Sequence, residues 1–418
     1  MSVEVTVLPN GLRVVTDRMD SVETIAVGAW VAAGTRHETA DVNGISHLLE
    51  HMAFKGTARR TAQGIAEEMD NVGGQLNAYT SRDHTAYFAK VLKEDTGLAV
   101  DILSDILLNS TMDSEELARE QHVVVQEIYQ ADDTPDDIIF DHFQATAYPD
   151  QPMGWPVLGS EGIVRSITSE RLRRYMSDNY AADTMVISAA GNVDHDKFVR
   201  MVESTFAALP TRAKISELPS HYNGGDFRQQ RDLEQVHLVL GFGGIPYGDR
   251  DYYNLNALST LMGEGMSSRL FQEIREKRGL AYSVGSNTQS FSDSGLFSIY
   301  VGTGGDDLTK MIPVLCDEIR KSVDGFTPDE IKRARAQTKA GLLMSMESPS
   351  SRCTQRARQT MIYGRALTMA EVMEKVEGVD GQGIIDVAHR VFASAPTLAT
   401  LGDLGTLEAF DEIRARLQ

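Results

Sequence analysis

Three side chains that can do metal chemistry, His47, Glu50 and His51, fall within one five-residue stretch. On a helix, side chains four residues apart project from the same face, so both imidazoles can bind one metal ion. The order H-x-x-E-H is the inverse of the H-E-x-x-H zinc motif, and its glutamate can act as a general base. A polar helix face without a metal is the alternative interpretation of so short a pattern.

The flanking residues predict the helix that this pattern requires. Residues 43–46 (NGIS) offer a helix start, and Gly56 offers a stop. Apolar residues recur on one side of the segment, namely Ile45, Leu48, Leu49 and Met52. We therefore expect an amphipathic helix with the two histidines on its other side.

Zinc held by two imidazoles still needs a third protein ligand, typically a carboxylate, with water in the open position. A second helix is predicted from Asp113, which stands three residues before Glu116 as in a capping box. It carries two candidate carboxylates, Glu120 and Glu127, seven residues apart on one face. Three other histidines lack any such spacing, and we expect them to be ordinary surface or core residues: His84, His122 and His142.

Two longer stretches, residues 44–56 (GISHLLEHMAFKG) and 73–80 (GGQLNAYT), closely resemble the pitrilysin and insulysin family of zinc peptidases. The resemblance is strongest to the beta subunit of the mitochondrial processing peptidase and its bacterial relatives, and it extends along nearly the whole chain. It implies one Zn²⁺ per chain, with His47, His51 and Glu127 as ligands. Glu127 lies 76 positions after His51 (127 minus 51), about the interval that this family uses. Glu120 is implied to orient the site.

The same residues predict a hydrolytic mechanism. Zinc lowers the pKa of its water toward about 7, and Glu50 takes the water's proton and passes it to the leaving amine. As in relatives, an exposed strand at residues 75–79 would pair with an extended peptide, with Asn77 and Ala78 nearest the cleaved bond. An ordinary strand edge is the alternative. Phe54 would line the pocket for the residue after the cut, or else pack in the core.

An acidic run after Glu127 bears on specificity. Asp137 and Asp141 are four residues apart, so on a helix both carboxylates could receive one guanidinium. In processing peptidases an acidic pair in this region binds the arginine just before the cut. The resemblance therefore predicts unfolded, basic peptide substrates with arginine at that place. A solvated acidic turn after Pro135 is the alternative.

The chain also repeats itself. Residues 112–119 (MDSEELAR) match 326–333 (FTPDEIKR) at an offset of 214 (326 minus 112), and residues 191–193 match 402–404 at an offset of 211 (402 minus 191). We predict an α+β fold of two homologous domains, each an antiparallel β-sheet covered by α-helices. Residues 1–210 would be the zinc-binding catalytic domain, 211–229 a linker, and 230–418 a repeat without metal.

The second repeat lacks the metal motif but carries its own candidates. At the 214 offset, Glu120 and Glu127 fall on Ala334 and Gly341. Arg275 and Tyr282, seven residues apart, look like a pair that in relatives reaches the substrate at the metal site; otherwise they are surface residues. The preceding glycine-containing stretch, residues 263–271, is too short to indicate an alpha-type partner subunit.

Composition excludes several other classes. The net charge of −20 and pI of about 4.9 argue against a general nucleic-acid binder. Two cysteines, Cys316 and Cys353, cannot form a disulfide framework or a cysteine-rich zinc site, and they fit a reducing compartment. We find no apolar run of about 18 residues and no targeting peptide, so we expect no membrane span. We predict the bacterial cytoplasm, with the mitochondrial matrix as the alternative.

Taken together, these features predict a zinc endopeptidase that cleaves peptides inside a clamshell chamber. By resemblance it would form a homodimer, or a heterodimer with a related subunit. A catalytically silent structural or partner subunit, such as the core proteins of the respiratory bc complex, is the alternative. Silent members usually lose motif residues, and the intact set of His47, Glu50, His51 and Glu127 favours the peptidase.

Overall fold

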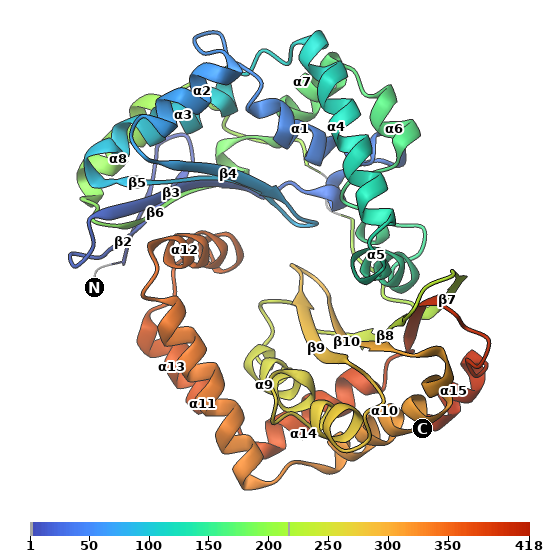
Figure 1. Ribbon diagram of the computed structural model, residues 1–418. Helices are drawn as coiled ribbons and strands as arrows, with labels where there is room; N and C mark the ends of the chain where they lie inside the picture. Colours follow the sequence, from blue (N-terminus) through green and yellow to red (C-terminus); the bar gives the residue numbers. More distant parts are fainter. Residues whose placement is uncertain (1–2, 216–217) are drawn as a thin grey trace. The chain divides into compact units, whose positions relative to one another are not determined.

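A computed structural model describes residues 3–215 and 218–418, which form two compact units (Figure 1). The first unit comprises Met1–Tyr129, Trp155–Leu218 and Leu343–Thr368. The second comprises Gln130–Gly154, Pro219–Leu342 and Met369–Gln418. Each unit thus contains one segment from the opposite half of the chain. Within the expected linker, residues 216–217 lie outside the described residues, and residues 225–229 already belong to a strand.

The first unit is built on a six-stranded sheet in the order β1-β2-β6-β3-β5-β4. Its strands are β1 (Val3–Val7), β2 (Arg13–Arg18), β3 (Thr24–Val31), β4 (Gln75–Thr80), β5 (Thr85–Leu92) and β6 (Met185–Gly191). Neighbouring strands are antiparallel except β2 and β6, which are parallel. Strand β4 lies at one edge, as expected for a strand that could pair with a peptide.

The second unit repeats this topology with five strands in the order β7-β11-β8-β10-β9. They are β7 (Gly225–Gln230), β8 (Val236–Gly243), β9 (Ser283–Ser290), β10 (Gly295–Thr303) and β11 (Thr397–Gly402). Again one pair, β7 and β11, is parallel and the others are antiparallel. In chain order these strands correspond to β2, β3, β4, β5 and β6. The predicted α+β duplication is confirmed, with one parallel pair in each otherwise antiparallel sheet.

Helices cover the first sheet. They are α1 (Ile45–Ala53), α2 (Ala62–Asp70), α3 (Thr96–Leu108), α4 (Ser114–Asp132), α6 (Glu161–Ser166), α7 (Ser169–Asn179), α8 (His195–Thr205) and α12 (Pro349–Tyr363). The main core lies between the sheet and the helices from the first half of the chain. A smaller core forms where α12 packs against β6, β3 and β2.

The second sheet is covered in the same manner. Its helices are α5 (Pro135–Ala147), α9 (Tyr252–Gly263), α10 (Leu308–Asp324), α11 (Pro328–Ser345), α13 (Met369–Glu377), α14 (Gly381–Phe392) and α15 (Phe410–Arg416), with a π-helical turn at Phe271–Glu276. Helix α5 packs against β11, β8 and β7. Because α5 and α12 begin 214 residues apart (349 minus 135), the repeats have exchanged equivalent helices. The predicted division of the sequence into two contiguous domains, separated by a linker at residues 211–229, stays a prediction.

Short 3-10 turns connect these elements at Thr35–His37, Ala40–Val42, Lys93–Asp95, Pro152–Gly154, Ala182–Thr184 and Gly305–Asp307.

Buried ion pairs fasten the exchanged helix α12 to the first sheet. The carboxylate of Asp17, on β2, is fully buried and lies 3.1 Å from Arg352 Nη1 and 2.8 Å from Arg356 Nε. Arg356 also donates to Gln359 and to the carbonyl of Leu367. Removing Asp17 would take away the carboxylate that neutralises both buried guanidinium groups, so the pairs favour one position of α12.

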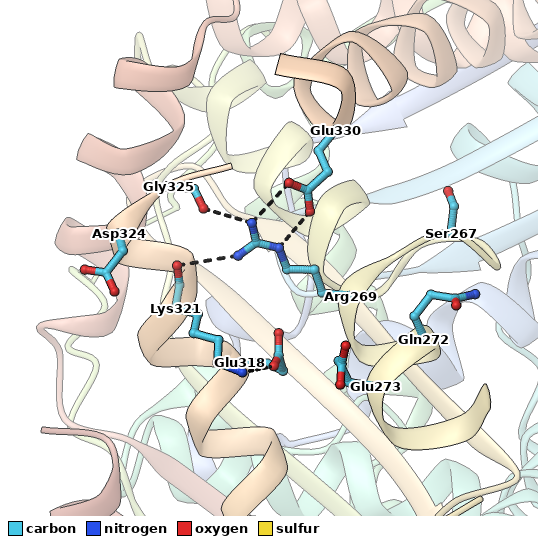
Figure 2. A pocket seen from close by; sticks show the side chains of 9 residues that line it. All are labelled: Ser267, Arg269, Gln272, Glu273, Glu318, Lys321, Asp324, Gly325 and Glu330. Atoms are coloured by element: carbon cyan, nitrogen blue, oxygen red, sulfur yellow. Dashed lines mark hydrogen bonds and ion pairs between the residues drawn. The ribbon is translucent and has the colours of Figure 1, made fainter. Parts of the chain in front are cut away.

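A polar hollow of about 450 Å³ in the second unit lies beside the glycine-containing stretch of residues 263–271 (Figure 2). Its central guanidinium, Arg269, binds Glu330 at 2.8 Å and the carbonyl of Gly325 at 2.9 Å. Burial acts to raise the pKa of Glu330, but hydrogen bonds from Arg269 and Thr327 outweigh it and lower the pKa to about 2. These contacts anchor the stretch to α10 and α11.

Candidate metal centre and active site

The helix that carries the H-x-x-E-H motif is held at its N-terminus by a buried carboxylate. Glu38 accepts hydrogen bonds from the backbone N–H groups of Gly44 and Ser46, each at 2.8 Å, and burial raises its pKa. Gly44 has φ +94°, and a Cβ there would lie 2.8 Å from the carbonyl oxygen of Leu158, so only glycine fits. The apolar face of α1 then packs in the core and leaves the motif side chains on the other face.

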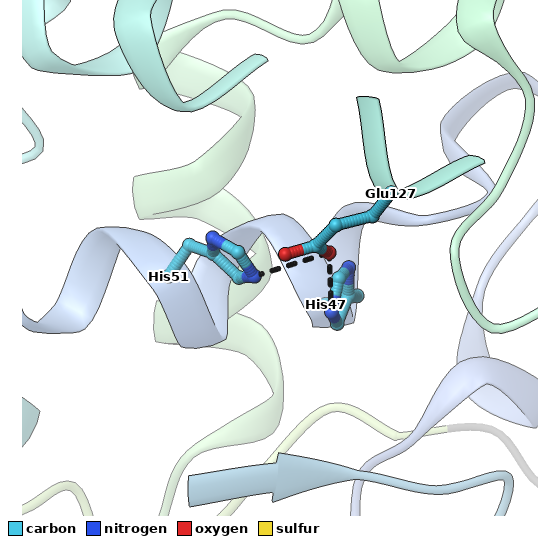
Figure 3. A group of neighbouring side chains, drawn as sticks. All are labelled: His47, His51 and Glu127. Atoms are coloured by element: carbon cyan, nitrogen blue, oxygen red, sulfur yellow. Dashed lines mark ion pairs between the residues drawn. The ribbon is translucent and has the colours of Figure 1, made fainter. Parts of the chain in front are cut away.

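Helices α1 and α4 bring the three predicted zinc ligands together (Figure 3). The Nε2 atoms of His47 and His51 lie 3.7 Å and 3.6 Å from Oε2 of Glu127. One ligand atom from each residue lies within 4.8 Å of the others, and no other group of three such side chains occurs within residues 3–215 and 218–418. Burial, and then the neighbouring His51, lowers the pKa of His47 to about 3. The imidazole is therefore neutral, the form that binds metal.

Glu120 contacts one of the three predicted zinc ligands, His51. Its buried carboxylate lies 3.0 Å from Nδ1 of His51 and 2.7 Å from Nζ of Lys55. A carboxylate on Nδ1 directs the opposite ring nitrogen, Nε2, toward a metal. Nδ1 of His47, in contrast, is buried and has no partner in the described part of the chain. Two imidazole nitrogens and a carboxylate oxygen form a donor set that fits zinc.

Glu50 lies on α1 between the two histidines. Its Oε2 accepts a hydrogen bond of 2.6 Å from the hydroxyl of Thr80, the last residue of β4. Burial raises the pKa of Glu50, while the bond from Thr80 acts in the opposite direction. A carboxylate held in this way beside the two histidines can act as a general base.

A hollow of about 560 Å³ borders the edge strand β4. Phe54, directly after α1, lines it, and so does Asn77. Most of the other lining residues are apolar and come from α2 and the two strands: Ala62, Ile65, Ala66, Met69, Leu76 and Phe88. The Asn77 side chain accepts a hydrogen bond of 2.8 Å from the backbone N–H of Ala78. Both predicted strand residues thus lie on an edge strand of the sheet, and Asn77 borders the hollow, whose wall also includes Asp70, Gln75, Lys90 and Ser350.

Four predicted site residues belong to the second unit. Arg275 lies over two rings, 5.2 Å from the centre of Tyr282 and 4.7 Å from that of Phe271. Asp137 and Asp141 are both on α5, at the four-residue spacing that the sequence predicts for one face. Asp137 is exposed, and Asp141 is half-buried. The roles of these four residues toward the metal group stay predictions.

The structure also shows residues that the sequence did not single out. Thr80 alternates with Ala78 and Leu76 on β4, so the period of two could have placed it on the side facing α1. Lys55 lies four residues after His51, but beyond the end of the helix. No sequence signal marked Glu38, because it acts from a loop.

The three histidines that were set aside do not join the metal group. His84 bonds with the Tyr79 hydroxyl at 2.9 Å, His122 is exposed, and the ring of His142 stacks on Phe227.

A duplicated α+β chain with a His, His and Glu group defines a candidate zinc protein, and family comparisons specify it further. Residues 13–161 match the family described as insulinase (peptidase family M16), and residues 166–338 match the peptidase M16 inactive domain. A zinc protease of Rickettsia felis, itself named uncharacterized, is 42% identical over 396 residues, covering 94% of this chain and 96% of the relative. Another from Bacillus subtilis is 38% identical over 400 residues, covering 95% and 98%. The chain belongs to peptidase family M16.

Solved structures share this fold. A protease from Helicobacter pylori aligns with a TM-score of 0.88 at 23% identity, covering 96% of this chain and 99% of that chain. A peptidase M16 inactive domain from Pseudomonas fluorescens aligns with a TM-score of 0.89 at 18% identity, covering 96% and 98%. Similarity to the beta subunit of the processing peptidase stays a prediction, as does the cellular compartment, although both sequence relatives are bacterial. In the described part of the chain, no helix is long and apolar enough to cross a membrane.

Proposed function

We propose that this chain is a zinc-dependent endopeptidase that holds one Zn²⁺ through His47, His51 and Glu127. The observation that carries the proposal is the approach of Glu127 on α4 to the two histidines on α1, with Glu50 between them. The names of the relatives support zinc and proteolysis. Glu120 and its bond to His51 support the orientation of one ligand ring.

Zinc, when bound, supplies Lewis acidity toward the scissile carbonyl and acidifies a water molecule. Glu50 accepts the proton of the attacking water and donates it to the leaving amine.

The substrate in this proposal is an extended peptide that adds a strand to the edge of β4. The backbone of Asn77 and Ala78 would hold it. The side-chain amide of Asn77 must then turn aside, because its oxygen accepts the hydrogen bond of the Ala78 N–H. Phe54 and the apolar hollow would take the side chain after the cut. Arg275 and Tyr282 would contact the substrate, and Asp137 with Asp141 would select arginine before the cut.

The first experiment measures zinc content and peptide cleavage by the purified chain, using internally quenched basic peptides. The wild-type chain should bind about one zinc and cleave. Glu50→Gln should keep its zinc, because all three ligands remain, yet lose roughly 10²- to 10⁴-fold in kcat. Near-normal turnover in that variant would refute the mechanism.

The same assay addresses partners. We propose that the chain works as a homodimer or with a related subunit, so the chain should be assayed alone and at several concentrations. Activity that rises more steeply than protein concentration supports a homodimer. Zinc binding without cleavage by the chain alone at every concentration would instead point to a missing related subunit.

A second experiment tests specificity with matched peptides that carry Arg or Ala before the cut. The wild type should prefer the Arg peptide, because two carboxylates at helical spacing match the guanidinium fork. The Asp137→Asn, Asp141→Asn double variant should lose that preference while its kcat for the Ala peptide is unchanged. A preference that survives the double change would remove these residues from the specificity site.

A further inference from the structure

Thr80 connects the edge strand to the helix of the metal motif. Its hydroxyl donates a hydrogen bond of 2.6 Å to Oε2 of Glu50. No other role for this hydroxyl follows from the zinc ligands or from the peptide-binding backbone. The bond joins the element that would hold the substrate to the side chain that would move the proton.

The strand fixes the direction of this hydroxyl. Leu76 and Ala78 pack against the core between sheet and helices, and Thr80 follows them at the same period of two. Thr80 is paired with Thr85 on β5, and Ser81 N–H donates to the carbonyl of His84 at 2.9 Å, which closes the turn directly after it. A β-branched side chain at such a position has few χ1 rotamers.

Glu50, in contrast, has three side-chain torsions and needs an external contact to keep one orientation. A bond to Oε2 restricts the carboxylate and leaves its second oxygen for the water. Geometry matters here, because a misplacement of about 1 Å can cost about 10²-fold in rate.

We propose that Thr80 is a positioning residue that holds the general base Glu50 in register with the peptide bound to β4. The inference rests on the proposed peptidase function. The same rigid strand sets the place of the scissile bond and the orientation of the base, so neither can shift without the other.

Thr80→Val tests this directly, because valine keeps the shape and strand preference of threonine but has no donor. We expect kcat to fall roughly 10- to 100-fold, with KM and zinc content unchanged. Thr80→Ser keeps the donor and should remain within about threefold of wild type, since it restores the bond. Binding of a non-cleavable peptide analogue, measured without turnover, should be equal in all three proteins.

The second repeat offers a matched control. Thr288 lies on β9, the edge strand equivalent to β4, and its hydroxyl donates to Asn256 at 3.1 Å. Thr288→Val removes a comparable hydroxyl far from the motif in sequence and should leave kcat unchanged.

Several outcomes would overturn the assignment. They are a Thr80→Val enzyme with wild-type kcat, a Thr80→Ser enzyme as impaired as Thr80→Val, and loss of zinc from Thr80→Val. If Thr80→Val does not fold, Thr80→Ala replaces it in the same comparison with Thr80→Ser. A wild-type chain that neither binds zinc nor cleaves peptide refutes the peptidase function itself, whereas equal cleavage by wild type and Thr80→Val refutes the role of Thr80 alone.

Discussion

The two repeats of this chain share a strand order and differ in chemistry. In the first, α1 and α4 bring His47, His51 and Glu127 together. In the second, α9 contains neither histidine nor glutamate, and α11 has Ala334 and Gly341 at the positions that match Glu120 and Glu127. The second sheet nevertheless forms without them. The metal group is therefore an addition to the fold, and the fold of each repeat is held by its apolar core.

The exchanged helices differ in a second respect. Helix α12 is fastened to the first sheet by Asp17, Arg352 and Arg356. Helix α5 packs on the second sheet mainly through apolar side chains such as Ile139 and Phe143, and the nearby Tyr148 hydroxyl donates to the carbonyl of Gly295 at 3.0 Å. Helix α12 thus combines apolar packing with buried ion pairs, whereas α5 is held mainly by apolar packing.

We expect the largest effect on this comparison from substitutions in the metal group of His47, His51 and Glu127. Glu127→Ala should release zinc and abolish cleavage, because two imidazoles alone hold the ion weakly. Glu120→Gln should keep the ligands but weaken zinc binding about 10- to 100-fold. Zinc content after dialysis against a competing chelator measures both effects. As the control in the metal-free repeat, Glu330→Gln should leave zinc content unchanged, and full zinc occupancy in Glu127→Ala would mean that another carboxylate is the ligand.

The next effect concerns the attachment of α12. Asp17→Asn removes the carboxylate that neutralises two buried guanidinium groups, which should cost about 3–5 kcal/mol. Hydrogen exchange should then rise in α12 before it rises in the sheet. In the other unit, Tyr148→Phe removes one neutral hydrogen bond and should cost only about 1 kcal/mol. Equal losses in both variants would show that the buried charges have no special part in holding α12.

The sequence predicted the local elements and the duplication well, but it gave no indication that the repeats exchange two helices. Periodicity and caps indicated α1 and the start of α4. The exchange of α5 and α12 had no sequence signal, because an apolar helix face does not specify which sheet it will cover.

The candidate site was likewise predicted only in part. The spacing of His47 and His51 on one helix was evident from the sequence, whereas the choice of Glu127 depended on family resemblance. The contacts of Thr80 with Glu50 and of Lys55 with Glu120 join distant segments, so tertiary structure alone reveals them. The helix begins where the sequence predicts, but the capping side chain comes from Glu38, six residues before Gly44.

The hairpin turns of the two sheets should respond differently to acid. Burial, and then Arg358, lowers the pKa of His84 to about 4, and the equivalent turn at residues 291–294 has no histidine. Between the folded value and the ordinary value of 6.5, the unfolded chain binds a proton that the folded chain does not. Stability is therefore lost as pH falls below 6.5 toward 4.

Because His84 is only half-buried, we expect this loss to be about 1–2 kcal/mol. Urea unfolding at pH 7 and pH 5 should show a smaller loss in His84→Gln than in wild type. His122→Gln, which changes an exposed histidine, is the control and should behave as wild type does. An identical pH response in His84→Gln would assign the acid sensitivity to other groups.

The smallest expected effect compares the starts of the two long helices, α4 and α11, which also lie at the 214 offset. Asp113 accepts hydrogen bonds from the N–H groups of Glu115 and Glu116, and these bonds lower its pKa. Thr327 instead forms a reciprocal cap, in which its hydroxyl accepts from Glu330 N–H and Glu330 accepts from Thr327 N–H at 2.7 Å.

Thr327→Ala should cost about 1 kcal/mol, which is about a fivefold increase in hydrogen exchange in the first turn of α11. Exchange in the first turn of α4 should not change, because each cap bonds only its own helix. Asp113→Ala should reverse this pattern, whereas Asp113→Asn should retain the cap at neutral pH. Asp113→Asn should also remove the pH dependence of the cap. A carboxylate whose pKa is lowered on folding stabilises the helix above its ordinary pKa, and this stabilisation is lost as pH falls through the pKa of the folded state. If either alanine variant speeds hydrogen exchange in both helices equally, the first turns of α4 and α11 do not open independently of each other.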